Sequence, residues 1–415
     1  MSVLERDFFT DPEILQDPLP YYRALHERGP VMREPHKGVF MLSRIDDIAE
    51  IYTDHERFSA IVGPLGPLID LPRPEEGESW PEVIERRRHE VPMAEEITSL
   101  DPPKHTRHRA LIGKLFTPSR LKENEEFMAS LAEGLIDEFA DRGQIEFSEA
   151  YARPFTLLVV ADLLGVPRED HHTFRGWLGG QEGNVGDPEG RHVADRVFEN
   201  LHPYFTRYIE ARRAAPRDDV LSRLAGVRFP DGELPDVMDV VRLAAILFAA
   251  GQETTARLLC AGMRFLCEQP ALADELRRDP GAIPNFVEEC LRLEGPIKGS
   301  FRLALCDTKL AGVDIPAGSI VMAVIGAANR DPRVFEDPDR FDPRRANARR
   351  NIAFGHGEHF CPGASLARAE ARISFARLLA RLDDFRLVDP EKLSYAETFI
   401  IRGLNRVPMR FRRRS

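Results

Sequence analysis

A single cysteine set among glycines constrains this chain more than any other feature of its sequence. Cys361 stands in the run FGHGEHFCPG, residues 354–363. Apolar residues then recur with the period of an amphipathic helix over residues 364–382. The cysteine is therefore predicted at a helix start, where backbone N–H groups and the helix dipole stabilise a thiolate. The glycines, Gly355 among them, would let a flat ligand approach the main chain, and Phe354 would keep water off the sulfur.

The alternative for this loop is a buried structural cysteine in a glycine-rich turn, which explains most lone cysteines. The complete pattern F-G-x-G-x-H-x-C-x-G is more specific than that. It resembles the haem-binding loop of the cytochrome P450 monooxygenases. The resemblance implies that Cys361 ligates the iron of haem b. It also implies that Phe354, Gly355, His359 and Gly363 contact the cofactor.

Length, charge and cysteine content are consistent with this resemblance. The chain has 415 residues, and the resemblance implies one helix-rich cytochrome P450 domain over residues 1–415, with a small β-rich lobe near its N-terminus. A net charge of −11 argues against nucleic acid as a partner. The five cysteines are sparse and form no CxxC pair, so neither a disulfide framework nor a zinc site is predicted.

The sequence offers no segment that predicts a membrane span. Its longest apolar candidate, residues 243–251, is far shorter than the roughly 20 residues that a spanning helix needs. Residues 1–11 are acidic and lack the apolar core of a signal peptide. We therefore expect a cytoplasmic protein without a membrane anchor, and the resemblance implies a monomer.

Helical periodicity dominates from Ser119 onward, which predicts a mainly α fold with a minor β region, and by resemblance the cytochrome P450 fold. The predicted helices are 121–141, 156–164, 193–213, 234–266, 270–276, 283–293 and 364–382. Residues 301–323 are strand-like, with turns at glycines. Two stretches rich in Pro and Gly, 63–81 and 179–190, are predicted to be long loops.

The helix predicted over residues 234–266 is apolar nearly all round at its centre, which indicates burial. Glu253 and Thr254 stand in that centre, where a buried carboxylate and hydroxyl are costly unless something uses them. Thr254 can bond back to the carbonyl of Ala250, which distorts a helix. A solvated polar stripe is the alternative, which the apolar flanks disfavour. The segment resembles the family's oxygen-activation motif A-G-x-[DE]-T. The resemblance implies Glu253 and Thr254 as catalytic proton-delivery residues and Ala250 as a cofactor contact.

Glu289 and Arg292 form an E-x-x-R pair at helical spacing. Such a pair is common on surface helices and contributes roughly a few tenths of a kcal/mol there. Its position before the cysteine loop resembles the structural motif of the family. The resemblance implies that Arg340 completes a salt-bridged triad, which holds the loop-rich segment 329–351 in place and takes no part in catalysis.

His105 and Arg109 lie four residues apart at the start of a predicted helix, so both could face one anionic ligand. A basic surface helix is the more common explanation for a lone H-x-x-x-R. The surrounding run DPPKHTRHR resembles bacterial members of the family, in which this pair binds the haem propionates. By the same resemblance, Arg302 and His359 are the other two propionate partners.

Substrate contacts are inferred from position alone. Ile246 and Ala249 precede the acid–threonine pair on its helix, and Ile297 and Ile400 align with family segments that line the distal pocket. All four also fit an ordinary core. An apolar lining suits a hydrophobic substrate that few polar groups orient. Lys298 could bind a carboxylate, but we expect it to point to solvent.

The resemblance implies a monooxygenase that hydroxylates a hydrophobic small molecule, namely a terpenoid, steroid or aromatic hydrocarbon. Dioxygen and electrons from a ferredoxin and ferredoxin reductase pair would drive it. Two alternatives, a peroxide-driven peroxygenase and a haem protein that senses or carries a gas, do not need the acid–threonine pair. A basic cluster before the cysteine loop, Arg344, Arg345, Arg349 and Arg350, would steer an acidic ferredoxin. A solvated charge run is the alternative explanation of that cluster.

Overall fold

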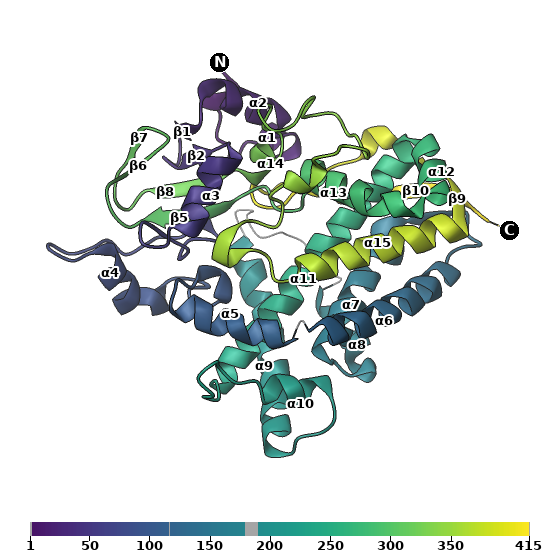
Figure 1. The fold of residues 1–415 in the computed structure, drawn as a ribbon, viewed down its shortest axis with the longest axis horizontal. Helices are drawn as coiled ribbons and strands as arrows, with labels where there is room; N and C mark the ends of the chain where they lie inside the picture. The colour runs from purple at the N-terminus through teal and green to yellow at the C-terminus, as the bar shows by residue number, and fades with distance from the viewer. Residues whose placement is uncertain (1, 116, 179–189, 415) are drawn as a thin grey trace.

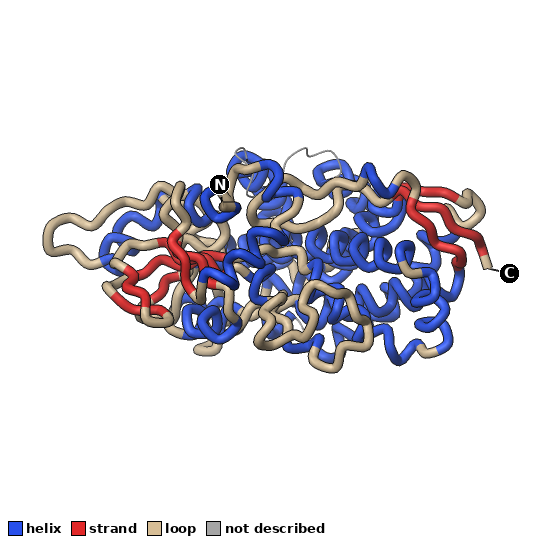
Figure 2. Tube along the Cα trace, turned by 90° about the horizontal axis from the view of Figure 1, so that it is seen from above, coloured by secondary structure: helices blue, strands red, loops and turns tan. Residues whose placement is uncertain are grey.

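Helices form most of the computed structural model, which describes residues 2–115, 117–178 and 190–414 (Figure 1). The strands gather near the two ends of the long axis, and the helical body lies between them (Figure 2). None of the helices in these ranges is long and apolar enough to cross a membrane.

The helices confirm the mainly α class. Their bounds are α1 Pro12–Gln16, α2 Leu19–Arg28, α3 Ile45–Thr53, α4 Trp80–Arg87, α5 Lys104–Leu115, α6 Pro118–Asp137, α7 Arg153–Leu164, α8 His171–Leu178, α9 Gly190–Ala214, α10 Val220–Ala225, α11 Val237–Glu268, α12 Pro270–Arg278, α13 Ile283–Glu294, α14 Ile325–Ala328 and α15 Ala364–Arg381. A π-helical turn, Ser148–Ala152, leads directly into α7. The periodicity predicted most of the long helices to within a few residues of these bounds.

The larger sheet joins the first sixty residues to a segment from the last third of the chain. Its strands, in the spatial order β1-β2-β8-β5-β3, are β1 Val31–Arg33, β2 Phe40–Leu42, β8 Ile320–Ala323, β5 Ser300–Ala304 and β3 Phe58–Ser59. Strands β2 and β8 pair in parallel, and the other neighbours are antiparallel. The predicted N-terminal β lobe and two of the strands in the region predicted at 301–323, β5 and β8, therefore form one sheet.

Two smaller sheets complete the β structure of the described residues. A hairpin is formed by β6 Thr308–Leu310 and β7 Val313–Ile315. At the other end of the molecule, β10 Pro408–Arg413 lies between β4 Gln144–Glu146 and β9 Leu382–Leu387. These long-range pairings fix the chain's C-terminal strand against the helical body.

Helix α6 shows why the predicted boundaries shift. It begins at Pro118, because the side chain of Thr117 accepts a hydrogen bond from the N–H of Arg120 and proline is favoured in a first turn. It ends at Asp137, four residues before the predicted end, and turns follow it. The loop predicted at 63–81 contains a short 3-10 turn and the start of α4, whereas the loop predicted at 179–190 lies almost wholly outside the described residues.

Helix α11 is the longest of the described helices and packs against α7, α9, α13 and α15. Most side chains are buried in two runs of this helix, Val240–Phe248 and Thr255–Cys267. The segment 249–254 between these runs is not buried. Burial on both sides fixes the helix, and the open middle segment carries the predicted acid–threonine pair.

Candidate active site

The cysteine loop turns back on itself through one backbone hydrogen bond. The N–H of Cys361 donates to the carbonyl of Phe354 at 2.9 Å. Gly355 and Gly357 have φ of +74° and +67°, a conformation that other residues rarely adopt. Helix α15 begins only at Ala364, so Cys361 lies three residues before the helix. The sequence pattern had predicted that Cys361 lies at the helix start.

Cys361 as a residue is partly exposed, whereas Cys260, Cys267 and Cys290 are buried and Cys306 is exposed, 55 residues before Cys361. Burial raises the pKa of Cys361, while the backbone N–H of Gly363 and the charges of Arg109 and Arg368 oppose that rise. A metal cation bonded to the sulfur would remove its proton outright. The chemistry of this thiol therefore suits a metal ligand that is protonated until the metal binds.

Four basic side chains converge beside the loop from α5, β5 and the loop itself. The rings of His105 and His359 lie 4.0 Å apart between centroids. Burial, followed by the charges of Arg109 and Arg302, lowers the pKa of His105 to about 4. Burial and the charge of Arg302 lower the pKa of His359 to about 2. Arg109 and Arg302 supply the positive charge and the two neutral imidazoles can donate hydrogen bonds, so the four groups together favour an anion.

None of these four side chains forms an ion pair with a described residue. Arg109 donates to the carbonyl of Phe360, and Arg302 donates to the carbonyl of Phe301 at 2.8 Å. The side chain of His105 is nearly inaccessible to solvent, and its Nδ1 atom is buried without a hydrogen-bond partner. Buried polar atoms usually have partners, so this cradle has the chemistry of an anion-binding site.

The open segment of α11 has the hydrogen bond that the sequence predicts, although the helix is continuous through it. The hydroxyl of Thr254 donates to the carbonyl of Ala250 at 2.8 Å. The sequence analysis missed Thr156 of α7, whose hydroxyl donates to the carbonyl of Gln252 at 2.8 Å. A side chain at Gly251 would lie 3.0 Å from Val160 of α7. Two hydroxyls therefore bond carbonyls within one turn of α11, where α7 approaches closely.

Glu253 is less buried than the sequence analysis expected. Its side chain is 25% exposed and forms ion pairs with Arg257 at 2.7 Å and with Arg153 at 3.5 Å. Arg257 follows Glu253 by four residues on the same helix, a spacing that predicts such a pair. Arg153 comes from α7, and nothing in the sequence pointed to it. The carboxylate therefore has both cationic partners and access to solvent.

Known proteins resemble this chain along nearly its whole length. The family profile described as Cytochrome P450 matches residues 282–396. Vitamin D(3) 25-hydroxylase of Pseudonocardia autotrophica is 33% identical over 407 residues, which are 96% of this chain and 95% of that protein. The chain belongs to the cytochrome P450 family. It is thus an oxidoreductase of the cytochrome P450 monooxygenase class.

Solved P450 structures share the fold. Substrate-free CYP150A6 of Mycobacterium marinum matches with a TM-score of 0.92 and 43% identity, covering 99% of this chain and all of that one. CYP109E1 of Bacillus megaterium, solved in complex with testosterone, matches with a TM-score of 0.80 and 29% identity, covering 95% of this chain and 99% of that one.

The cofactor of P450 enzymes is haem, whose iron a cysteine thiolate ligates. The residues of this chain fit that group on their own chemistry. Cys361 supplies a thiol, and the cradle supplies the cations Arg109 and Arg302 and the neutral imidazoles of His105 and His359 as hydrogen-bond donors for two propionates. The orphaned Nδ1 atom of His105 is the clearest sign that the cradle is built for a ligand.

The E-x-x-R pair of this P450 is fully buried, and its third partner differs from the prediction. Arg292 donates to both carboxylate oxygens of Glu289 at 2.7 Å. Arg345 also donates to Glu289, at 3.1 Å. Arg340 is exposed and contributes only its backbone carbonyl, which accepts from Arg292 and from Arg345. The predicted role of the Arg340 side chain is therefore wrong, and Arg345 takes it.

The same contacts reduce the number of charges that the predicted basic cluster before the cysteine loop can offer to a ferredoxin. Arg345 is buried and paired, so its charge cannot meet a partner protein. Arg344 is exposed but forms an ion pair with Glu275 at 2.7 Å. Arg349 and Arg350 are exposed in the 3-10 turn Ala348–Arg350. Of the four arginines, only Arg349 and Arg350 are exposed and form no ion pair with a described residue.

The predicted substrate contacts come from two regions. Ile246 is buried, and Ala249 is partly exposed, on α11. Ile297 pairs with Ile401 in an isolated antiparallel bridge, which brings the segment after α13 beside the C-terminal loop that holds Ile400. The structure thus joins two segments that lie about a hundred residues apart in the sequence.

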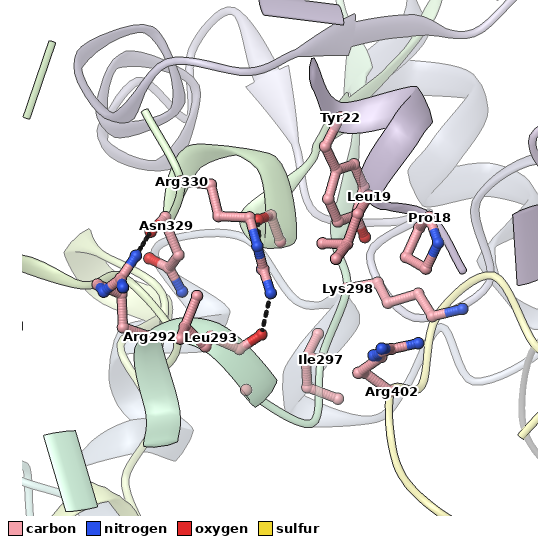
Figure 3. Close-up of a pocket in the computed structure, with 12 residues that line it drawn as sticks. Pro18, Leu19, Tyr22, Arg292, Leu293, Ile297, Lys298, Asn329, Arg330 and Arg402 are labelled. Atoms are coloured by element: carbon pink, nitrogen blue, oxygen red, sulfur yellow. Dashed lines mark hydrogen bonds between the residues drawn. The ribbon is translucent and has the colours of Figure 1, made fainter. Parts of the chain in front are cut away.

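Lys298 does not point to solvent as expected. It is 2% exposed, and it lines a pocket together with Tyr22, Arg330 and Arg402 (Figure 3). Figure 3 also shows Arg292 donating to the carbonyl of Asn329, one of three carbonyls in the loop-rich segment 329–351 that accept from this arginine. Burial lowers the pKa of Lys298 to about 7.

Proposed function

We propose that this P450 holds haem through Cys361 and hydroxylates a hydrophobic small molecule with dioxygen. The observation that carries the proposal is the cradle of two arginines and two histidines, which has no carboxylate partner among the described residues, beside the partly exposed residue Cys361. Phe354, Gly355 and Gly363 of the cysteine loop and Ala250 of α11 would contact the haem. Bound haem supplies the activation of dioxygen for insertion of one oxygen atom into a C–H bond.

Thr254 and Glu253 would manage the protons of this reaction. Thr254 uses its hydroxyl proton in the bond to Ala250, so its oxygen accepts a hydrogen bond from a water or a protonated group. Glu253 reaches solvent and is held by Arg257 and Arg153. An acid that exchanges between its arginine partners and the open segment can carry protons inward from solvent.

The substrate would be a rigid hydrocarbon skeleton with few polar groups, such as a steroid or a terpenoid. The predicted contacts Ile246, Ala249, Ile297 and Ile400 are all apolar. One relative is named for hydroxylation of vitamin D(3), and one similar structure holds testosterone. An apolar lining and relatives of this kind favour a substrate that is oriented by shape more than by hydrogen bonds.

Electrons would come from an acidic ferredoxin. The enzyme would act in the cytoplasm as a monomer. Arg349 and Arg350 are exposed in the segment that leads into the cysteine loop. Their charge contrasts with the acidic whole and would orient an acidic partner toward that loop.

The test is turnover of testosterone by the haem-loaded protein under labelled dioxygen. With NADH, a ferredoxin and its reductase, we expect a product that carries one labelled oxygen atom, and we expect testosterone to shift the haem spin state. Product formed only with hydrogen peroxide would identify a peroxygenase instead. Binding of carbon monoxide without turnover of any steroid or terpenoid in either system would favour a gas-binding protein.

A further inference from the structure

Lys298 joins two distant segments through its ammonium group. The Nζ atom donates to the carbonyl of Leu15 at the end of α1, at 3.0 Å, and to the carbonyl of Thr398 in the C-terminal loop, at 2.6 Å. Hydrogen bonds from a charged donor are about twice as strong as neutral ones. The lysine therefore ties the N-terminal helices to the loop between β9 and β10.

The backbone of Lys298 holds the same loop. Its N–H donates to the carbonyl of Ile400 at 2.7 Å, and its carbonyl accepts from the N–H of Gly326 at 3.0 Å. The preceding residue, Ile297, pairs with Ile401. Two of the four predicted substrate contacts, Ile297 and Ile400, are thus either adjacent to this lysine or bonded to it.

No carboxylate among the described residues neutralises this ammonium group by direct contact. Glu294, whose charge raises the pKa of Lys298, is already paired with Arg402 at 3.1 Å and with Arg264 at 3.3 Å. Figure 3 shows the lysine beside the guanidinium of Arg402 and below Tyr22. A buried cation in such surroundings is costly, and an apolar side chain could fill the same space. A specific use for the charge would explain its presence.

We infer that Lys298 is a positioning residue for the distal pocket, the space between α11 and the segments of Ile297 and Ile400. Its ammonium group would hold these two segments at the spacing that a hydrophobic substrate needs. The inference rests on the proposed function, because it takes Ile297 and Ile400 as substrate contacts. Lys298 would therefore raise the affinity for the substrate without contacting the substrate.

The protonation of Lys298 provides a way to measure this role. Burial, and then the charge of Arg402, lower the pKa of Lys298 to about 7. Below that pH the group is charged and its two bonds are strong, whereas above it the neutral amine donates more weakly. The grip on the two segments should therefore weaken as the pH rises through about 7.

Other charged groups face this region from every neighbouring element. They are Asp17, Tyr22 and His26 near α2, Arg257 on α11, Glu294 on α13, Arg330 after α14 and Arg402 in the C-terminal loop. Burial raises the pKa of Tyr22 to about 12, and the arginines hold the pKa of Glu294 low against burial, so neither titrates near neutrality. His26 is hydrogen-bonded to the carbonyl of Ala327 and is retained in every variant below.

The experiment uses the haem-loaded protein and two probes that ligate iron, namely 4-phenylimidazole, whose ring reaches the pocket walls, and imidazole, which is smaller. The variants are Lys298→Met and, as control, Lys309→Met at a side chain that is 70% exposed. Comparing each variant with the parent at one pH cancels the protonation of the probes. We expect Lys298→Met to bind 4-phenylimidazole about fivefold more weakly than the parent near pH 6, and about equally near pH 9.

Imidazole should bind the parent and both variants equally at both pH values. A loss for 4-phenylimidazole of the same size at both pH values would overturn the inference, since it would show that the ammonium charge is not what positions the segments. An equal loss for both probes would also overturn it, because the damage would then lie at the haem.

The parent alone gives a second test that needs no folded variant. With each affinity expressed per unprotonated probe molecule, from the pKa of each probe in water, the ratio of the 4-phenylimidazole affinity to the imidazole affinity should fall between about pH 6 and pH 9, and a constant ratio would overturn the inference. Failure of testosterone to bind would refute the proposed substrate class, but these probes would still measure the role of Lys298.

Discussion

Thr254 and Glu253 are neighbours on α11 with different surroundings. The Thr254 hydroxyl is used in a bond to the Ala250 carbonyl, whereas the Glu253 carboxylate is paired with two arginines and reaches solvent. In the proposed function, the Thr254 hydroxyl would accept a hydrogen bond at the inner end of a proton path and Glu253 would be its solvent end.

Replacing Thr254 with Ala should uncouple the reaction. The variant should bind substrate and consume NADH, but release more hydrogen peroxide for each product molecule, because the hydroxyl that controls proton placement is gone. Product and peroxide measured per NADH give the coupling directly. Unchanged coupling in the variant would count decisively against proton control by Thr254.

Glu289 is the residue whose surroundings the sequence could predict only in part. The i,i+3 spacing predicts its pair with Arg292, since both lie on one helix. It does not predict Arg345, because the third partner depends on the path of an irregular loop that has no period. Arg340 and Arg345 both occur in that loop, and only the folded structure shows which side chain turns inward.

Replacing Glu289 with Gln should lower the free energy of unfolding by about 3–5 kcal/mol, because two buried guanidinium groups would lose their counter-charge. The matched control, Arg340→Gln, removes an exposed side chain and should change stability by less than about 0.5 kcal/mol. Denaturant unfolding of both variants measures the difference. Equal losses in the two variants would return Arg340 to the triad.

At the scale of elements, the approach of α7 to α11 shapes the open segment. Gly251 faces Val160 so closely that a side chain would lie 3.0 Å from it, and Thr156 bonds a carbonyl one residue further along α11. The sequence predicts both helices from their periodicity. It does not predict their contact, because a periodicity of 3.6 residues identifies the buried face of a helix but not the helix that packs against that face.

Gly251→Val should therefore lower the free energy of unfolding by about 2 kcal/mol through overpacking. Adding Val160→Ala should restore part of that loss, which a double-mutant cycle would reveal. Gly113→Val in α5 is the control, since no atom lies within 4 Å of the side chain it would add. A Gly251→Val loss no larger than that of Gly113→Val would exclude close packing at this point.

The sheets show the same limit. Strand-like residues at 301–323 predict β5 to β8, and short apolar runs predict strands near the N-terminus. The parallel pairing of β2 with β8 joins residues nearly 300 apart, and local sequence carries no signal for it. Cys361 was predictable because ten adjacent residues carry its pattern, whereas the pairing of Ile297 with Ile401 was not.

Over the whole molecule, an acidic surface contrasts with the exposed Arg349 and Arg350. Gln at both positions should slow first-electron transfer from an acidic ferredoxin at low ionic strength and leave substrate affinity unchanged. The difference should shrink as salt screens the charges. Arg386→Gln, in the sheet at the far end, is the control. Stopped-flow rates that match the parent at low salt would place the ferredoxin elsewhere.

Ligation of haem by Cys361 is the claim on which the account depends, and one spectrum tests it. The dithionite-reduced carbon-monoxide complex of a thiolate-ligated haem has a characteristic red-shifted Soret band. Cys361→His should load haem and lose that band, because imidazole replaces the thiolate. Cys306→Ser, at an exposed cysteine, should keep it. Retention of the band in Cys361→His would show that another residue holds the iron, and would contradict the account.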